Sequence, residues 1–156
     1  METRFSSEVP EKLGEARNGF ELRYNVKETP MDEIVREWES QRGGMEGEGS
    51  SPDDAFIREH RWMYNVVRVP MGQWNYGGIV NAIVRDKYAS DEMESITNNM
   101  NVIVAEFFEH LVADGILSAT KYLMGSINTE NTENFASMQK WRSMAKAEAR
   151  QVLKMV

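Results

Sequence analysis

Apolar residues recur at the three- and four-residue spacing of an α-helix over most of this 156-residue chain, whereas one stretch alternates with a period of two. In that stretch, residues 20–27, Phe20, Leu22, Tyr24 and Val26 alternate with polar side chains. A single strand leaves its backbone groups unpaired. It therefore pairs with another chain, pairs with itself, or is not a strand. An arm that adds to a neighbour's sheet and an ordered coil held by its own helices are equally good interpretations.

Six helices are predicted after this stretch from apolar stripes and capping residues. They cover residues 29–42, 52–68, 79–88, 90–114, 116–124, and 135 to near the C-terminus. The longest is the expected core helix, and Gly115 follows it as the residue that ends it. Its apolar positions are Met93, Ile96, Met100, Ile103, Phe107 and Leu111, widened by Val104, Phe108 and Val112. The expected fold class is mainly α, a small helical bundle with an extended N-terminal arm that can supply one β-strand.

Three parts are expected along the chain. Residues 1–28 lack helical periodicity and form the extended arm. Residues 29–42 form a helix that Thr29 caps, with Pro30 in its first turn. Residues 43–51, with the sequence GGMEGEGSS, have the composition of a flexible linker. Residues 52–156 are the helical bundle domain.

Several kinds of chemistry are excluded by composition. The chain has no cysteine, so disulfides, thiolate zinc sites and cysteine nucleophiles are ruled out. A diiron site of the ferritin type needs Glu-x-x-His on two helices, but Ile57 and Phe107 stand where those glutamates would precede His60 and His110. We expect His60 to be a hydrogen-bonded core residue and His110 to lie at the edge of the core helix. No catalytic, cofactor-binding or metal-binding residue is predicted, and the protein is not expected to be an enzyme.

Targeting signals are also lacking in the sequence. No apolar run approaches the roughly 20 residues of a membrane helix. The N-terminal residues have no apolar core of a secretory signal, so an intracellular origin is expected.

Charge is distributed unevenly. The chain has 18 Lys and Arg against 25 Asp and Glu, for a net charge of −7, yet residues 134–156 carry Glu148 alone against five basic residues. Their helical spacing favours a solvated helix face near a helix C-terminus. Contact with nucleic acid is disfavoured because the rest of the chain would repel phosphate. A third interpretation is docking onto an acidic surface, which the N-terminal third of a second copy supplies.

Trp74 and Tyr76 lie in a loop rich in glycine and aromatic residues, between Pro70 and Gly78. Large aromatic side chains in such a loop either cover the bundle or anchor a protein interface. The interface is the favoured interpretation.

Two runs carry a family resemblance. The first extends from Trp74 through Tyr88 and Ser90-Asp91-Glu92 to Asn98-Asn99, and the second from Phe135 through Trp141-Arg142 to Ala149. Together they resemble small proteins encoded among the structural genes of tailed bacteriophages, including crAss-like phages of gut Bacteroidetes. The resemblance covers about half of the chain, its C-terminal part. It implies a virion component of the head–tail connector, neck ring or tail region, made in the host cytoplasm, and brings no catalytic residues.

The expected function is therefore that of a non-enzymatic structural protein, present in many copies as a ring and contacting itself and other virion proteins. No cofactor and no membrane are expected as partners. The predicted interface residues are Phe20, Leu22, Tyr24, Val26, Trp74, Tyr76, Lys146, Arg150 and Lys154. Two alternatives remain: an assembly chaperone absent from the mature particle, and a small helical nucleic-acid-binding or packaging factor.

Overall fold

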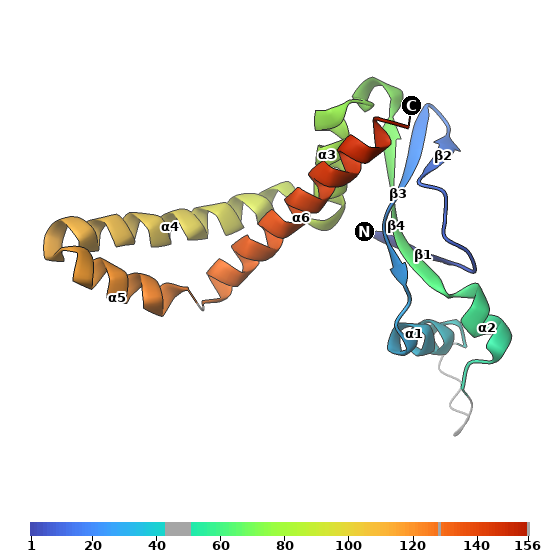
Figure 1. The fold of residues 1–156 in the computed structure, drawn as a ribbon, viewed down its shortest axis with the longest axis horizontal. Coiled ribbons are helices and arrows are strands. Elements are labelled where there is room, and N and C mark those ends of the chain that lie inside the picture. Colours follow the sequence, from blue (N-terminus) through green and yellow to red (C-terminus); the bar gives the residue numbers. More distant parts are fainter. Residues whose placement is uncertain (43–50, 128, 156) are drawn as a thin grey trace. The chain divides into compact units, whose positions relative to one another are not determined.

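The computed structural model of the chain describes residues 1–42, 51–127 and 129–155 (Figure 1). Helices account for 62% of these residues and strands for 19%. The fold is mixed α/β, so the prediction of a mainly helical bundle with at most one strand is wrong. The chain divides into two compact units, Met1–Gly78 with Met155–Val156, and Ile79–Lys154. The predicted linker lies, apart from Ser51, outside the described residues.

A four-stranded antiparallel sheet dominates the first unit, in the order β1-β4-β3-β2. Its strands are β1 (Glu2–Ser6), β2 (Leu13–Ala16), β3 (Gly19–Glu28) and β4 (Trp62–Pro70). The alternating stretch lies in β3, which confirms the strand. Its partners come from the chain itself, so an extended arm is wrong for residues 1–28. Gly19 permits close pairing, because a Cβ there would lie 2.3 Å from the Val69 carbonyl oxygen.

The helix predicted over residues 52–68 is wrong for most of its length. A short helix, α2 (Asp54–Glu59), begins where Phe56 N–H donates to the Asp53 carboxylate at 2.8 Å, and β4 follows it. Phe56, His60, Met63 and Val67 have helical spacing, but the residues of β4 are mostly aromatic and β-branched. Such side chains favour a pleated strand once neighbouring strands can pair with it.

A partly buried chain of polar side chains links three strands at a β-bulge. The register of β3 against β4 shifts between Tyr24 and Lys27, and Asn25 has a positive φ of 54°. The Asn25 amide donates to Asn65 Oδ1 at 2.8 Å, and the Asn65 amide donates to Thr3 Oγ1 at 3.1 Å. Because a slip by one residue would break both hydrogen bonds, this chain specifies the register of β1, β4 and β3.

The two faces of β3 carry different side chains. Leu22 and Tyr24 have no exposed surface, whereas the nearly buried Glu21 lies between Arg4 and Arg23 at 3.1 and 3.3 Å. A hydrogen bond with Glu2 and the charge of Glu21 raise the pKa of Arg4. The cluster is therefore a cross-strand ion network that supports the sheet.

Helix α1 (Met31–Gln41) begins one residue later than a Thr29 cap requires. Pro30 occupies the N-cap position, and no side chain makes a capping hydrogen bond there. The Thr29 hydroxyl is buried and has no hydrogen-bond partner in the described part of the chain. The helix is confirmed, but the role predicted for Thr29 is wrong.

Four further helices follow the short 3₁₀ helix η1 (Met71–Gln73). They are α3 (Tyr76–Lys87), which begins in the first unit, α4 (Ser90–Asp114), α5 (Ile116–Ser126) and α6 (Glu130–Val152). These confirm the predicted C-terminal helices, with shifted ends. In the second unit α4 and α5 lie side by side as a hairpin, and α6 packs on α4 (Figure 1).

Trp141 ties α6 to α3 in the second unit. Its indole N–H donates to the Ile83 carbonyl at 3.1 Å, and Lys87 Nζ lies 4.3 Å from its ring centroid. Small or flexible side chains, Ala145, Ala149 and Met138, are buried on α6. No helix in the described ranges is long and apolar enough to cross a membrane.

Candidate functional site: an exposed apolar helical hairpin

The hairpin of α4 and α5 exposes an unusual number of large apolar side chains. Ile103 is buried and the other five residues of the predicted main stripe of α4 are half-buried, but the prediction that Val104, Phe108 and Val112 widen this core stripe is wrong, because all three are exposed. Nine large apolar residues of the hairpin, which we call the apolar hairpin surface, are at least 37% exposed. They are Val102, Val104, Phe108, Val112, Ile116, Leu117, Leu123, Met124 and Ile127.

Contacts between the two helices orient this surface. The Tyr122 hydroxyl on α5 donates to the Glu106 carboxylate on α4, and the Tyr122 ring packs on His110 with centroids 4.9 Å apart. His110 also lies 3.7 Å from Asp114 and is half-buried, as expected of the edge of this helix. Gly115, with a positive φ of 80°, joins the helices. These contacts occupy the faces with which α4 and α5 pack on each other. The apolar side chains outside those faces are therefore exposed to solvent.

Exposure is greatest toward the tip of the hairpin. Val104, Phe108 and Val112 follow each other at four-residue spacing along α4, and Val112 is 86% exposed. Phe108 and Val112 line a shallow hollow of about 450 Å³ with Glu109 and Ala113. On the α5 side of the tip, Ile116 is 75% exposed.

Part of the apolar hairpin surface forms a continuous stripe. Val104, Phe108 and Val112 lie on one face of α4, and Phe108 and Val112 share a hollow. Exposed apolar side chains that gather in this way are suited to packing against another protein.

Acidic residues outnumber basic residues near the exposed apolar side chains. Residues 102–127 contain three acidic residues, Glu106, Glu109 and Asp114, and one basic residue, Lys121. Glu109 lies at the hollow and Asp114 at the end of α4, and both are exposed. This part of the hairpin therefore has a net charge of −2.

Helix α6 carries the opposite charge. The predicted interface residues Lys146, Arg150 and Lys154, together with Arg142, follow each other at four-residue spacing and are exposed. We call these four residues, of which Lys154 lies just beyond the end of α6, the basic α6 stripe. Met138, Ala145 and Ala149 are buried on another face of the same helix. The stripe is therefore not covered by the chain's own second unit.

The predicted interface residues of β3 lie in the chain's own sheet. Leu22 and Tyr24 have no surface with which to contact a partner in this structure. Phe20 and Val26 are half-buried, and Phe20 packs on Trp74 with ring centroids 4.5 Å apart at an angle of 45°. The structure thus brings the predicted arm and the predicted aromatic loop together within one chain.

Trp74 and Tyr76 differ in exposure. The Trp74 indole N–H is buried and has no hydrogen-bond partner among the described residues, whereas Tyr76 is 38% exposed. The Trp74 ring packs on Phe20 of the sheet. The interface roles of Trp74 and Tyr76 stay predictions.

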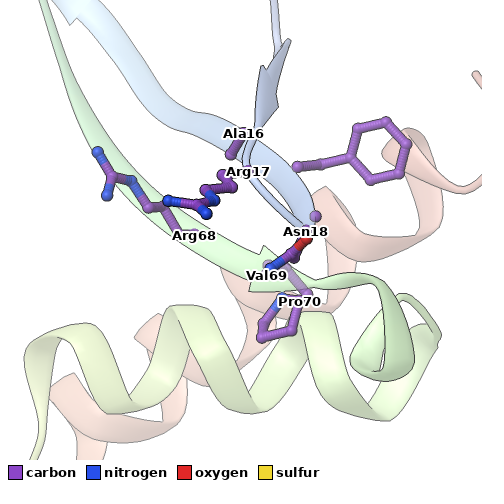
Figure 2. A pocket seen from close by; sticks show the side chains of 8 residues that line it. Ala16, Arg17, Asn18, Arg68, Val69 and Pro70 are labelled. Atoms are coloured by element: carbon purple, nitrogen blue, oxygen red, sulfur yellow. The ribbon is translucent and has the colours of Figure 1, made fainter.

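A second feature is a small pocket at the β2–β3 turn (Figure 2). Its volume is about 130 Å³, and it is lined by Ala16, Arg17, Asn18, Gly19, Phe20, Arg68, Val69 and Pro70. Figure 2 shows the side chains of Arg17 and Arg68 on the same side of the turn. The pocket is much smaller than the clefts that usually bind small molecules, so we do not consider it the primary site.

His60 contacts a backbone carbonyl and two aromatic rings. His60 Nδ1 lies 2.9 Å from the Phe56 carbonyl oxygen, and its ring contacts Phe5 and Phe56, which agrees with the predicted hydrogen-bonded histidine. In the segments that the structure describes, no three His, Asp or Glu side chains gather as a metal-binding group. Comparison with protein-family models, curated proteins and solved structures gives no match.

The sequence interpretation missed the apolar hairpin surface, although a signal was present. The spacing of Val104, Phe108 and Val112 predicts core positions, because these residues lie beside the main apolar stripe of α4. A helix in a small unit buries about one third of its circumference. A second apolar stripe beside the first therefore indicates a surface for a partner.

The hydrogen bond between Tyr122 and Glu106 leads to a pH prediction. It raises the pKa of Tyr122 above the ordinary value of 10.0, because the protonated phenol is the donor. The raised pKa means that this stabilisation is fully present below pH 10.0 and is lost as the pH rises through the folded-state value. We expect the unfolding free energies of wild type and Tyr122→Phe to converge above pH 10.0, measured by urea denaturation. A difference that does not change with pH would contradict this role.

Proposed function

We propose that this chain is a non-enzymatic structural protein that acts by assembling into a multi-copy particle component. The observation that carries the proposal is the apolar hairpin surface, whose large apolar side chains stay exposed in the single chain. Its residues are suited to packing rather than to acid–base or nucleophilic chemistry.

The setting that we propose for this assembly is the virion of a tailed bacteriophage, in the head–tail connector, neck ring or tail region. The support is the resemblance carried by residues 74–99 and 135–149. Other copies of the chain and other virion proteins are the partners in this proposal. The protein is made in the host cytoplasm and incorporated during particle assembly.

The test is the native mass of the purified protein, measured by light scattering at two concentrations and two salt levels. We expect a defined multiple of 17.9 kDa that persists on dilution. A monomer under all four conditions would contradict self-assembly. Salt-sensitive DNA binding that depends on Arg142 would favour the packaging factor, and absence of the protein from purified virions would favour the chaperone.

A further inference from the structure

We propose that the copies assemble head to tail, with the apolar hairpin surface of one copy packed on the basic α6 stripe of the next. This inference rests on the proposed function and specifies which two surfaces meet. The occupant of the hairpin surface is thus a second copy of this chain.

Charge distinguishes two possible contacts between copies, hairpin with hairpin and hairpin with α6. Residues 102–127, which hold the exposed apolar side chains, have a net charge of −2, with three acidic residues and one lysine, whereas residues 134–156 have a net charge of +4. Pairing of hairpin with hairpin would place two negative segments together, which is unfavourable. Pairing of hairpin with α6 brings opposite charges together.

The composition of both surfaces suits this pairing. Glu109 adjoins the hollow beside Phe108 and Val112, so a cation that approaches the hollow meets both a carboxylate and an apolar wall. Lys and Arg present long aliphatic stems below their charged groups. The basic α6 stripe can therefore cover the apolar side chains while its charges reach the surrounding carboxylates.

The two surfaces lie on different helices of the same unit and are both exposed. In a head-to-tail contact, the hairpin surface of one copy meets the α6 stripe of the next. The growing assembly therefore keeps a free hairpin surface at one end and a free α6 stripe at the other. Such heterologous contacts generate closed rings or open filaments. The geometry of the interface thus supplies a route to many copies without a symmetric dimer.

Charge reversal tests this pairing. The hairpin variant is Glu109→Lys with Asp114→Lys, and the stripe variant is Lys146→Glu with Arg150→Glu. We expect each alone to weaken assembly on the order of tenfold or more at low salt, measured as the concentration for half-assembly. An equimolar mixture should restore assembly, because each reversed surface then meets its complement. A matched control, Glu8→Lys with Glu39→Lys, changes the same number of exposed charges in the first unit.

The outcomes separate this inference from the proposed function. A wild type that never assembles overturns both. A wild type that assembles, with the stripe variant unchanged, overturns the head-to-tail pairing and leaves the structural role standing. Failure of the mixture to assemble, when both variants keep wild-type helix content, also overturns the pairing.

Discussion

Replacing Phe108 and Val112 together by glutamine is expected to dissociate the assembly into a 17.9 kDa monomer at concentrations where wild type is fully assembled. Each side chain loses about 1.5–3 kcal/mol of burial at the interface, so association weakens by roughly two to four orders of magnitude. The measurement is native mass by light scattering across a dilution series.

The fold should survive this change. Phe108 and Val112 are 56% and 86% exposed in the single chain, and glutamine is a good helix former, so circular dichroism should be unchanged. The matched control replaces Val9 and Met71, each 61% exposed in the first unit, by glutamine. If both double variants dissociate equally, or neither does, the apolar hairpin surface is not the interface.

The second large effect concerns the sheet. Leu22→Ala is expected to lower the free energy of unfolding by about 2–5 kcal/mol, because the side chain is fully buried on a strand with neighbours on both sides. Met71→Ala also truncates a large apolar side chain, at a position in the first unit that is 61% exposed and lies outside the proposed interface, and should lie within about 0.5 kcal/mol of wild type. Urea denaturation followed by tryptophan fluorescence measures both.

This comparison also tests the N-terminal fold. If residues 1–28 were an extended arm that folds only on a partner, Leu22→Ala would leave the stability of the isolated chain unchanged. A loss confined to the assembled form would therefore speak for an arm. A loss in the monomeric Phe108, Val112 variant as well would speak for the intramolecular sheet.

The sheet contains strands that local patterns of apolar residues do not predict. β3 could be predicted because apolar and polar side chains alternate along it. β1 and β2 are short, carry Glu2, Arg4 and Glu15, and give no comparable apolar signal. They are strands because β4 and β3 offer them hydrogen-bond partners, and those partners lie elsewhere in the sequence.

β4 illustrates a conflict between two signals. The helical spacing of Phe56, His60, Met63 and Val67 predicted a continuous helix, whereas the content of β-branched and aromatic residues after Arg61 favoured a strand. Pairing on both sides decided the outcome: Val67 lies opposite Leu22, and Asn65 hydrogen-bonds to Asn25 of β3 and to Thr3 of β1. Neither contact can be inferred from residues 52–68 alone.

One of the two surfaces of the candidate site could be predicted from the sequence. The spacing of Lys146, Arg150 and Lys154 predicted a basic helix face, which the structure exposes on α6. The sequence predicted the complementary acidic surface in the N-terminal third, whereas the proposed head-to-tail pairing uses the α4–α5 hairpin. Phe108 looked like a core residue because periodicity identifies an apolar face without saying what covers it.

The sequence by itself determined the C-terminal helices, the glycine that ends α4 and the strand character of residues 20–27. Those features depend on spacing and capping within a few residues, which local physics controls. The tertiary structure alone decided which strands surround β3 and which apolar stripe of α4 stays uncovered. Strand pairing joins segments that are far apart in the sequence, such as β1 and β4. Burial depends on how much surface a small unit can offer to cover a helix. Local periodicity therefore predicts neither the strand partners nor the covered stripe.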